Sequence, residues 1–380
     1  MTGLYIHIPF CKSKCLYCNF YAVASKKLAQ GFVEALLQEI ETRSHQWKDP
    51  HLRTVYMGGG TPSLLLPGDI ENILDFIKRY FILEPSCEIT LEANPDDISM
   101  QNLESWSKAG INRLSIGIQS QNETILKFLG RHHTAEQALE AYAMARKAGF
   151  NNISVDLIYG IQGLNNEEWE NALLKILSLE PEHFSCYALT LEEKTPYDFQ
   201  VKKGKLSLPD EELVAQQYEI LQEISSHKGY IQYEISNFCL PGYYSRHNTA
   251  YWQGIPYLGL GPSAHSYDGI KRWWNPSCIE EWKKLTTLDI GACPCEILTS
   301  INQYNEYIIT SLRTSWGLSI SHINKRFGEK FTRHTLQIAN SLTSIYLKKI
   351  GTDRIAIKSQ AYILADCILE RFILMDDSKI

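Results

Sequence analysis

Short apolar runs alternate with longer amphipathic segments along the first half of the chain. Up to about residue 190, each run is rich in Ile, Val, Leu and Tyr and is followed by a segment with apolar residues at helical spacing. The predicted strands are Leu4–Ile8, Thr54–Met57, Glu88–Glu92, Arg113–Gln119, Ile153–Ile158 and His183–Leu189. Amphipathic helices are predicted between them, for example at Leu28–Thr42 and Ala135–Ala148.

This repeat of strand and helix predicts an α/β fold. The repeated units imply a parallel sheet covered by helices, because parallel strands need a crossover connection. Right-handed crossovers would curl such a sheet into a partial (β/α)6 barrel. A flat, doubly wound sheet is the alternative. We expect this core domain to extend over residues 1–230.

The pattern changes after Leu191, where a polar stretch leads into a predicted helix at Glu211–His227. Residues 231–298 are rich in aromatic residues and glycine, and they predict an irregular region that connects two domains. In residues 299–380, three helical segments precede alternating runs at Asp353–Ile357 and Ala361–Leu364, which predict a β-hairpin. A mainly helical, winged-helix-like C-terminal domain is therefore expected.

Composition and charge narrow the choice of partner. The chain has 380 residues, of which 44% are hydrophobic, so it can bury the cores of two domains. Its net charge of −6 provides no electrostatic attraction for nucleic acid. No apolar run reaches the roughly 18 residues that span a bilayer, and the first ten residues do not resemble a secretion signal. We expect a cytoplasmic protein whose partner is a small molecule or another protein.

Cys11, Cys15 and Cys18 form a C-x3-C-x2-C pattern in the loop after the first predicted strand. Three thiolates can hold three irons of a 4Fe–4S cubane, which leaves the fourth iron open for an exchangeable ligand. A zinc site is the alternative, but structural zinc needs four ligands and no second cysteine pair follows. A zinc site that recruits His7 as its fourth ligand stays open as the alternative. The other cysteines are expected to be structural.

The residues before Cys11, Tyr-Ile-His-Ile-Pro-Phe, are more specific than the cysteines alone. With them the chain resembles the radical S-adenosylmethionine superfamily, and within it the oxygen-independent coproporphyrinogen III oxidase family, over nearly its whole length. The resemblance implies a radical-SAM barrel in which the amino and carboxylate groups of S-adenosylmethionine chelate the open iron. One electron from the cluster then breaks a C–S bond and gives a 5′-deoxyadenosyl radical.

The resemblance also implies which residues contact S-adenosylmethionine. The second strand ends in Met-Gly-Gly-Gly-Thr-Pro, where glycines let the backbone approach a ligand closely. This segment is similar to the one that holds the methionine amino group in the family, which assigns Gly59, Gly60 and Thr61. Further residues match family positions around the ligand: Tyr5, Tyr17, Glu92, Gln119, Arg131 and Asp156. Plain turns and loop hydrogen bonds are the alternative for each of them.

Two departures separate this chain from the oxidases. Phe20 stands two residues after the third ligand, where the oxidases carry a further cysteine, and the first strand begins almost at Met1 without their N-terminal extension. The chain instead resembles the HemW-type haem chaperones, whose H-N-x-x-Y-W motif is matched by His247, Tyr251 and Trp252. His247 can ligate haem iron axially while the two aromatic residues pack on the macrocycle. The alternative is that the three side chains have a structural role and pack beneath an irregular loop.

The resemblance implies a protein of porphyrin metabolism that binds haem and passes it to an acceptor protein, with a homodimer as one possible assembly. Its cofactors would be a 4Fe–4S cluster, S-adenosylmethionine and haem. An oxygen-independent coproporphyrinogen III oxidase is the alternative function, and an Fe–S carrier without haem is a third. From Phe20 and the missing extension, we expect no coproporphyrinogen oxidase activity.

Overall fold

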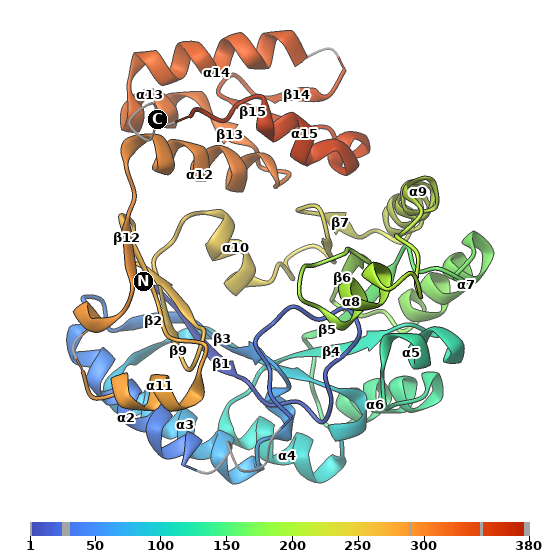
Figure 1. The fold of residues 1–380 in the computed structure, drawn as a ribbon, viewed down its shortest axis with the longest axis vertical. Helices are drawn as coiled ribbons and strands as arrows, with labels where there is room; N and C mark the ends of the chain where they lie inside the picture. Colours follow the sequence, from blue (N-terminus) through green and yellow to red (C-terminus); the bar gives the residue numbers. More distant parts are fainter. Residues whose placement is uncertain (1, 25–30, 289, 343–344, 376–380) are drawn as a thin grey trace.

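The computed structural model describes residues 2–24, 31–288, 290–342 and 345–375. Its central feature is a parallel sheet in which β1 to β6 lie side by side in chain order (Figure 1). These strands are β1 (Thr2–Ile8), β2 (His51–Gly59), β3 (Ile82–Ala93), β4 (Arg113–Gln119), β5 (Ile153–Tyr159) and β6 (His183–Ala188). The first five contain the predicted strands, and β6 ends at Ala188, one residue before the predicted end. The predicted α/β fold is therefore confirmed.

The two faces of this sheet differ in polarity, as β5 shows. Ile153, Val155 and Leu157 are buried in the apolar core beneath the helices. Ser154 and Asp156 alternate with them, so they point to the opposite, inner face. Because the inner face carries hydroxyl and carboxyl groups, it is suited to polar ligands rather than to a second apolar layer.

Helices cover the outer face, as the chain trace in Figure 1 shows. They are α2 (Phe32–Gln46), α3 (Pro67–Tyr80), α4 (Met100–Ala109), α5 (Glu123–Leu129), α6 (Ala135–Lys147), α7 (Asn166–Leu177) and α9 (Glu211–His227). The short helix α8 (Pro196–Lys202) instead lies beside the loop that follows β1. The bounds predicted for α9 are confirmed, and α6 ends one residue before its predicted end. The helix predicted at Leu28–Thr42 begins at Phe32 after Gly31 and continues to Gln46, and residues 25–30 lie outside the described part of the chain.

The irregular structure predicted for residues 231–298 was wrong for much of this region. Short strands from it extend both edges of the parallel sheet: β7 (Ile231–Gln232), β8 (Asn237–Cys239), β9 (Tyr257–Leu260), β10 (His265–Tyr267), β11 (Lys271–Trp274) and β12 (Cys295–Ile297). Two helices, α10 (Arg246–Trp252) and α11 (Ile279–Leu285), lie between them. Strands of two to four residues show too little alternation to be found from sequence, and pairing with longer strands stabilises them.

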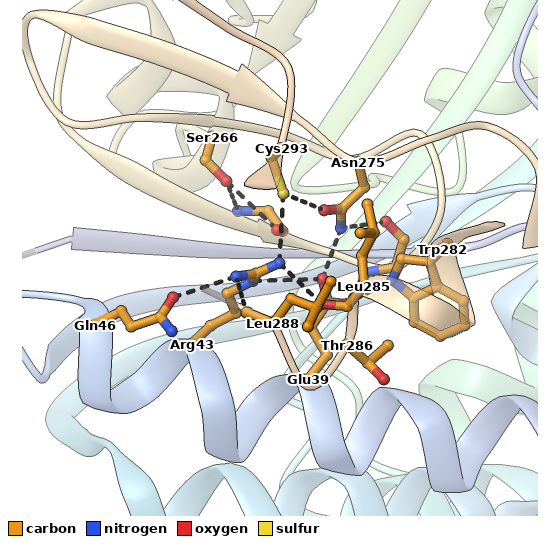
Figure 2. Close-up of polar contacts among 12 residues, drawn as sticks. Glu39, Arg43, Gln46, Ser266, Asn275, Trp282, Leu285, Thr286, Leu288 and Cys293 are labelled. Atoms are coloured by element: carbon orange, nitrogen blue, oxygen red, sulfur yellow. Dashed lines mark hydrogen bonds and ion pairs between the residues drawn. The ribbon is translucent and has the colours of Figure 1, made fainter. Parts of the chain in front are cut away.

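A buried polar cluster around Glu39 attaches this late segment to α2 (Figure 2). Glu39 accepts hydrogen bonds from the backbone N–H of Gly261 (2.7 Å), Nδ2 of Asn275 (2.7 Å) and Nε1 of Trp282 (2.9 Å). Arg43, one helical turn later, donates to the carbonyl oxygen of Leu288 (2.9 Å). Because Glu39 and Arg43 are fully buried, their charges depend on these partners.

The C-terminal residues form a winged-helix arrangement, as expected. Its elements are α12 (Ser300–Leu312), β13 (Leu318–Ser319), α13 (Ile320–Phe327), α14 (Glu329–Leu342), β14 (Leu347–Ile350), β15 (Arg354–Ile357) and α15 (Ala365–Glu370). The hairpin pairs β14 with β15, so its turn lies before Arg354. Ala361–Leu364 was wrongly predicted as a strand and belongs to a 3-10 helix, Ser359–Leu364, because the edge of β15 is already paired with β13 and β14.

The C-terminal residues described above lie against residues 231–298. The backbone N–H of Ser315 donates to the carbonyl oxygen of Tyr233 (2.9 Å), and Arg272 forms an ion pair with Glu306 (2.7 Å). In Figure 1, α10 lies between the parallel sheet and α12, and it contacts both β2 and α12. None of the helices in the described residues is long and apolar enough to cross a membrane.

Candidate functional site

A cavity of about 410 Å³ opens where the parallel strands end. It brings together most of the residues predicted to bind the cluster and S-adenosylmethionine: Cys11, Cys15, Tyr17, Cys18, Gly59, Gly60, Thr61, Glu92, Gln119, Arg131 and Asp156. Such a volume lies within the range of small-molecule pockets. Tyr5, His247, Tyr251 and Trp252 do not line this cavity.

The loop that carries Cys11, Cys15 and Cys18, called the cysteine loop below, is held at its base by backbone hydrogen bonds. The N–H of Val23 donates to the carbonyl oxygen of Pro9 (2.7 Å), and the N–H of Cys11 donates to that of Val23 (3.2 Å). In its middle, the carbonyl oxygen of Leu16 accepts a hydrogen bond from the N–H of Tyr197 at the start of α8 (2.9 Å). These contacts fix both the base and the tip of the loop, so the three thiols face the cavity from a defined backbone.

The thiols lie in an environment that favours metal binding over free thiolates. Burial raises the pKa of Cys11, and burial raises the pKa of Cys18 to about 11. The hydroxyl of Thr61 contacts Sγ of Cys11 (3.4 Å), and Nη1 of Arg131 contacts Sγ of Cys15 (3.7 Å). Because burial disfavours the charged form, thiolates at these positions would need a positive partner, such as a metal ion or a cluster.

The zinc alternative finds no support in the position of His7. Its Nε2 is hydrogen-bonded to the carbonyl oxygen of Tyr21 (2.8 Å), and its Nδ1 is hydrogen-bonded to the hydroxyl of Tyr5 (3.0 Å). In the described part of the chain, no three His, Cys, Asp or Glu side chains converge as ligands of one ion. A single zinc ion needs its ligands within about 2.3 Å, whereas a cubane separates its three thiolates, so the arrangement fits a cluster better.

Glycines at the end of β2 allow the backbone to pass close to the cysteine loop. Gly59 has φ +108°, and a Cβ there would lie 2.5 Å from the ring of His7. A Cβ on Gly60 would lie 2.7 Å from the carbonyl oxygen of Phe10. The N–H groups of Gly60 and Thr61 donate to backbone oxygens of the first strand and its loop, so they are already satisfied. An amino group of a ligand would instead need acceptor oxygens, which lie on the neighbouring strands.

Glu92 and Asp156 supply such acceptors on the inner face of the sheet. The two oxygens of Glu92 accept hydrogen bonds from the hydroxyl of Tyr56 (2.7 Å) and the N–H of Gly59 (3.1 Å). Burial raises the pKa of Glu92 to about 7, and the charge of Asp156 adds to this effect. Asp156 accepts from the hydroxyl of Ser115 (3.3 Å), and burial raises its pKa as well. Two partly desolvated carboxylates favour a cationic or hydroxyl-bearing ligand.

Gln119 reaches the cavity through an irregularity at the end of β4. The pairing with β5 shifts between Gly117 and Gln119, and Gln119 has φ +68°, which is uncommon for a residue other than glycine. Nη2 of Arg131 donates to the carbonyl oxygen of Gly117 (2.8 Å) and thereby holds the irregular segment. Strained backbone of this kind is frequent at ligand sites.

The H-N-x-x-Y-W segment forms α10 and lies at the other end of the strands. The ring of His247 is only 2% exposed, and burial lowers its pKa to about 3. Its Nδ1 is hydrogen-bonded to Thr54 (2.8 Å) near the start of β2, and its Nε2 is hydrogen-bonded to the hydroxyl of Tyr251 (2.8 Å). Both nitrogens therefore have partners inside the protein, and ligation of iron would require one of these hydrogen bonds to break. Tyr251 and Trp252 are partly exposed.

Sequence reasoning missed two side chains that shape the site. Asn94 accepts a hydrogen bond from Arg131 (2.6 Å), and Tyr56 donates to Glu92. Asn94 stands two residues after Glu92 in the sequence, and the alternation along β2 places Tyr56 on the same face as Gly58. Phe20 was identified from the sequence, and it lines the cavity as an exposed residue, with a relative exposure of 61%.

Comparison with known proteins identifies the family of the chain. Residues 5–176 match the Radical SAM superfamily. The chain is 36% identical to the heme chaperone HemW of Bacillus subtilis over 88% of both chains. It is 33% identical to the heme chaperone HemW of Lactococcus lactis over 99% of this chain and 98% of that one.

A solved structure shows the same fold. The coproporphyrinogen III oxidase HemN of Escherichia coli, described as a radical SAM enzyme, matches with a TM-score of 0.83 over 98% of this chain and 89% of that one. Its sequence identity of 23% supports the fold and nothing further. With the relatives that match nearly the whole sequence, these findings show that the chain belongs to the radical SAM superfamily and, within it, to the HemW family.

Proposed function

We propose that this protein binds haem and passes it to an acceptor protein, and that it carries a 4Fe–4S cluster with S-adenosylmethionine at the open iron. The observation that carries the proposal is the full-length similarity, at 32–36% identity, to proteins named heme chaperone HemW. The oxidase matches the fold at 23% identity.

The residues around the cavity fit the cluster and S-adenosylmethionine. Cys11, Cys15 and Cys18 would hold three irons, and the cluster, when bound, supplies one electron to the ligand at the fourth iron. The carboxyl groups of Glu92 and Asp156 would accept hydrogen bonds from the amino and hydroxyl groups of the ligand. Gly59 keeps the backbone close to the loop, which is consistent with these short approaches.

The α10 segment would form part of the haem site. His247 has an imidazole able to ligate iron, and Tyr251 and Trp252 have partly exposed rings able to pack on a porphyrin. Because Thr54 and Tyr251 hold the His247 ring, we expect loading to begin with loss of the hydrogen bond to the Tyr251 hydroxyl. Residues 231–298 would serve as the haem-binding region between the core and the C-terminal domain.

Phe20 argues against the oxidase as the working function. It stands where the resemblance places a further cysteine in oxidases, and its exposed ring lies at the cavity that would receive a substrate. A phenyl ring can neither donate a proton nor supply a thiol. The fold match alone leaves the oxidase as the second candidate.

The decisive experiment compares haem binding with coproporphyrinogen turnover in one preparation. Anaerobically reconstituted protein is titrated with haem and followed by Soret absorbance. A parallel sample receives coproporphyrinogen III, S-adenosylmethionine and a reductant, and its products are separated. We expect stoichiometric haem binding without protoporphyrinogen. Product formation without haem binding would support the oxidase instead.

A further inference from the structure

Tyr56 contacts both candidate sites, although it belongs to neither motif. It lies on β2 and faces the inside of the sheet, two residues before the glycine run begins at Gly58. Its hydroxyl donates to Oε1 of Glu92 (2.7 Å), and the other oxygen of Glu92 accepts from the N–H of Gly59 (3.1 Å). Glu92 and Gly59 line the cavity, so the phenol ends at the candidate S-adenosylmethionine site.

The ring of Tyr56 lies against the haem motif. It stacks on the imidazole of His247, with ring centroids 5.0 Å apart and an interplanar angle of 22°. Tyr5 stacks on Tyr56 at 6.2 Å and on His247 at 6.3 Å, which completes a group of three rings. A movement of the Tyr56 ring therefore changes the packing of His247, since interiors transmit displacements through close-packed side chains.

The backbone is shaped to allow the contact between Tyr56 and Glu92. A Cβ on Gly58 would lie 2.8 Å from the ring of Tyr56 and 2.9 Å from Oε1 of Glu92. Any larger residue at position 58 would push the phenol and the carboxylate apart. Glycine at position 58 therefore leaves the space that the hydrogen bond between Tyr56 and Glu92 occupies.

We propose that Tyr56 is a positioning residue shared by the two sites, so that S-adenosylmethionine in the cavity changes the affinity of α10 for haem. The inference rests on the function proposed above. A ligand that donates hydrogen bonds to Glu92 competes with the Tyr56 hydroxyl for the same carboxylate. Displacement of the phenol then loosens the stack on His247, whose reorientation toward iron requires space. Two sites that bias one shared element are coupled, and the coupling is reciprocal.

The test measures haem affinity of the cluster-loaded protein with and without saturating S-adenosylmethionine, by anaerobic Soret titration. We expect the ligand to tighten haem binding about fivefold or more, the lower limit of typical coupling between sites. Tyr56→Phe keeps the ring on His247 but loses the hydroxyl, so the two affinities should become equal. Tyr142→Phe is the matched control, because Tyr142 also hydrogen-bonds a charged side chain, Arg146, but lies outside both sites.

The reverse titration needs no variant. Haem must change the affinity for S-adenosylmethionine by the same factor, because the coupling free energy is common to both ligands. A smaller effect in the unmodified protein, or an effect that survives in Tyr56→Phe, overturns the inference. If haem binds equally well in both conditions, only the coupling fails. If haem does not bind in either condition, the proposed function fails together with it.

Discussion

Nη1 of Arg131 lies 3.7 Å from Sγ of Cys15, and the same guanidinium donates to Asn94 (2.6 Å) and to the carbonyl oxygen of Gly117 (2.8 Å). One side chain after α5 therefore connects the cysteine loop to the ends of β3 and β4. Its positive charge lies beside a predicted cluster ligand. Positive charge and hydrogen bonds at the sulfurs stabilise the reduced, more negative state of a cluster.

Replacing this guanidinium should lower the reduction potential of the cluster. Arg131→Met removes both the charge and the hydrogen bond near Cys15, so the reduced state loses stabilisation. We expect a fall on the order of 60 mV, equivalent to about 1.4 kcal/mol for a one-electron couple. Redox titration followed by EPR measures it, with the exposed Arg79→Met as the control. Equal potentials in both variants would show that Arg131 does not act on the cluster.

The cluster itself is tested by iron and sulfide analysis. Protein reconstituted anaerobically should bind about four irons per chain, the content of one cubane. Replacing Cys11, Cys15 or Cys18 by Ala should remove them, because each thiolate would hold one iron. Cys87→Ala is the control, since Cys87 is buried in β3 and does not line the cavity. Iron content unchanged by the three substitutions would overturn the cluster assignment.

The long parallel strands were predictable because each is marked by a run of apolar residues and a following helix. Leu114, Ile116 and Ile118 alternate with polar or small residues along β4, and every one is fully buried. Local pattern and tertiary environment agree there. The cavity residues were named from the resemblance to a known family. The structure brings two of them, Gly59 at the end of β2 and Asp156 within β5, to the same cavity.

The rest of the sheet could not be predicted, because its strands depend on partners distant in the chain. Gly3 of β1 pairs with Tyr257 of β9, and neither segment shows in its own sequence that the other lies beside it. The position of His247 could not be predicted from the sequence for the same reason. Its partner Thr54 is a β2 residue, and only the closed fold brings them to 2.8 Å.

Binding of S-adenosylmethionine should depend on pH through Glu92. Burial raises the pKa of Glu92 to about 7, so the carboxyl is largely protonated below that pH and accepts fewer hydrogen bonds. If the ligand binds the ionised form, its affinity should rise by up to about tenfold per pH unit below the pKa and level off above it. The change in the EPR spectrum of the reduced cluster, titrated at several pH values, measures the affinity.

Glu92→Gln separates this effect from titration of the ligand, whose α-amino group has an ordinary pKa of about 8. The variant should bind more weakly, and its affinity should vary less between pH 6 and 7 than that of the unmodified protein. The contribution of Glu92 to folding stability depends on pH in the opposite direction to the ligand affinity. Since the folded-state pKa lies above the unfolded value of about 4.3, this group's contribution to stability falls as pH rises from that value through 7. Identical pH profiles in both proteins would exclude Glu92 as the titrating group.

The Glu39 cluster should be among the sites most sensitive to substitution. Glu39→Ala leaves Arg43 buried without its carboxylate partner and removes the acceptor of Nε1 of Trp282 and of the backbone N–H of Gly261. We expect a loss on the order of 3–5 kcal/mol in the free energy of unfolding, the cost of breaking a buried ion pair. Urea unfolding measures it. Glu34→Ala, exposed on the same helix, should stay within about 0.5 kcal/mol of the unmodified protein. Similar losses in both variants would show that the cluster is not stabilising.

The haem motif is tested by two substitutions with different expected results. His247→Leu removes the candidate axial ligand, so the Soret band of bound haem should shift. Trp252→Ala removes aromatic contact without touching iron, so it should weaken affinity and leave the band in place, with a loss of about 1–3 kcal/mol. His227→Leu, exposed at the end of α9, is the control for loss of a histidine.

The same spectra decide whether the imidazole of His247, which is hydrogen-bonded to Thr54 and Tyr251, ligates haem iron or only packs inside the protein. If iron takes Nε2, the hydroxyl of Tyr251 loses its partner, and Tyr251→Phe should bind haem more tightly than the unmodified protein because one competing hydrogen bond is gone. The expected gain is about fivefold, corresponding to roughly 1 kcal/mol. If His247 only packs inside the protein, His247→Leu and Tyr251→Phe should both leave the Soret band and the affinity unchanged, and the axial ligand must be sought elsewhere in the chain.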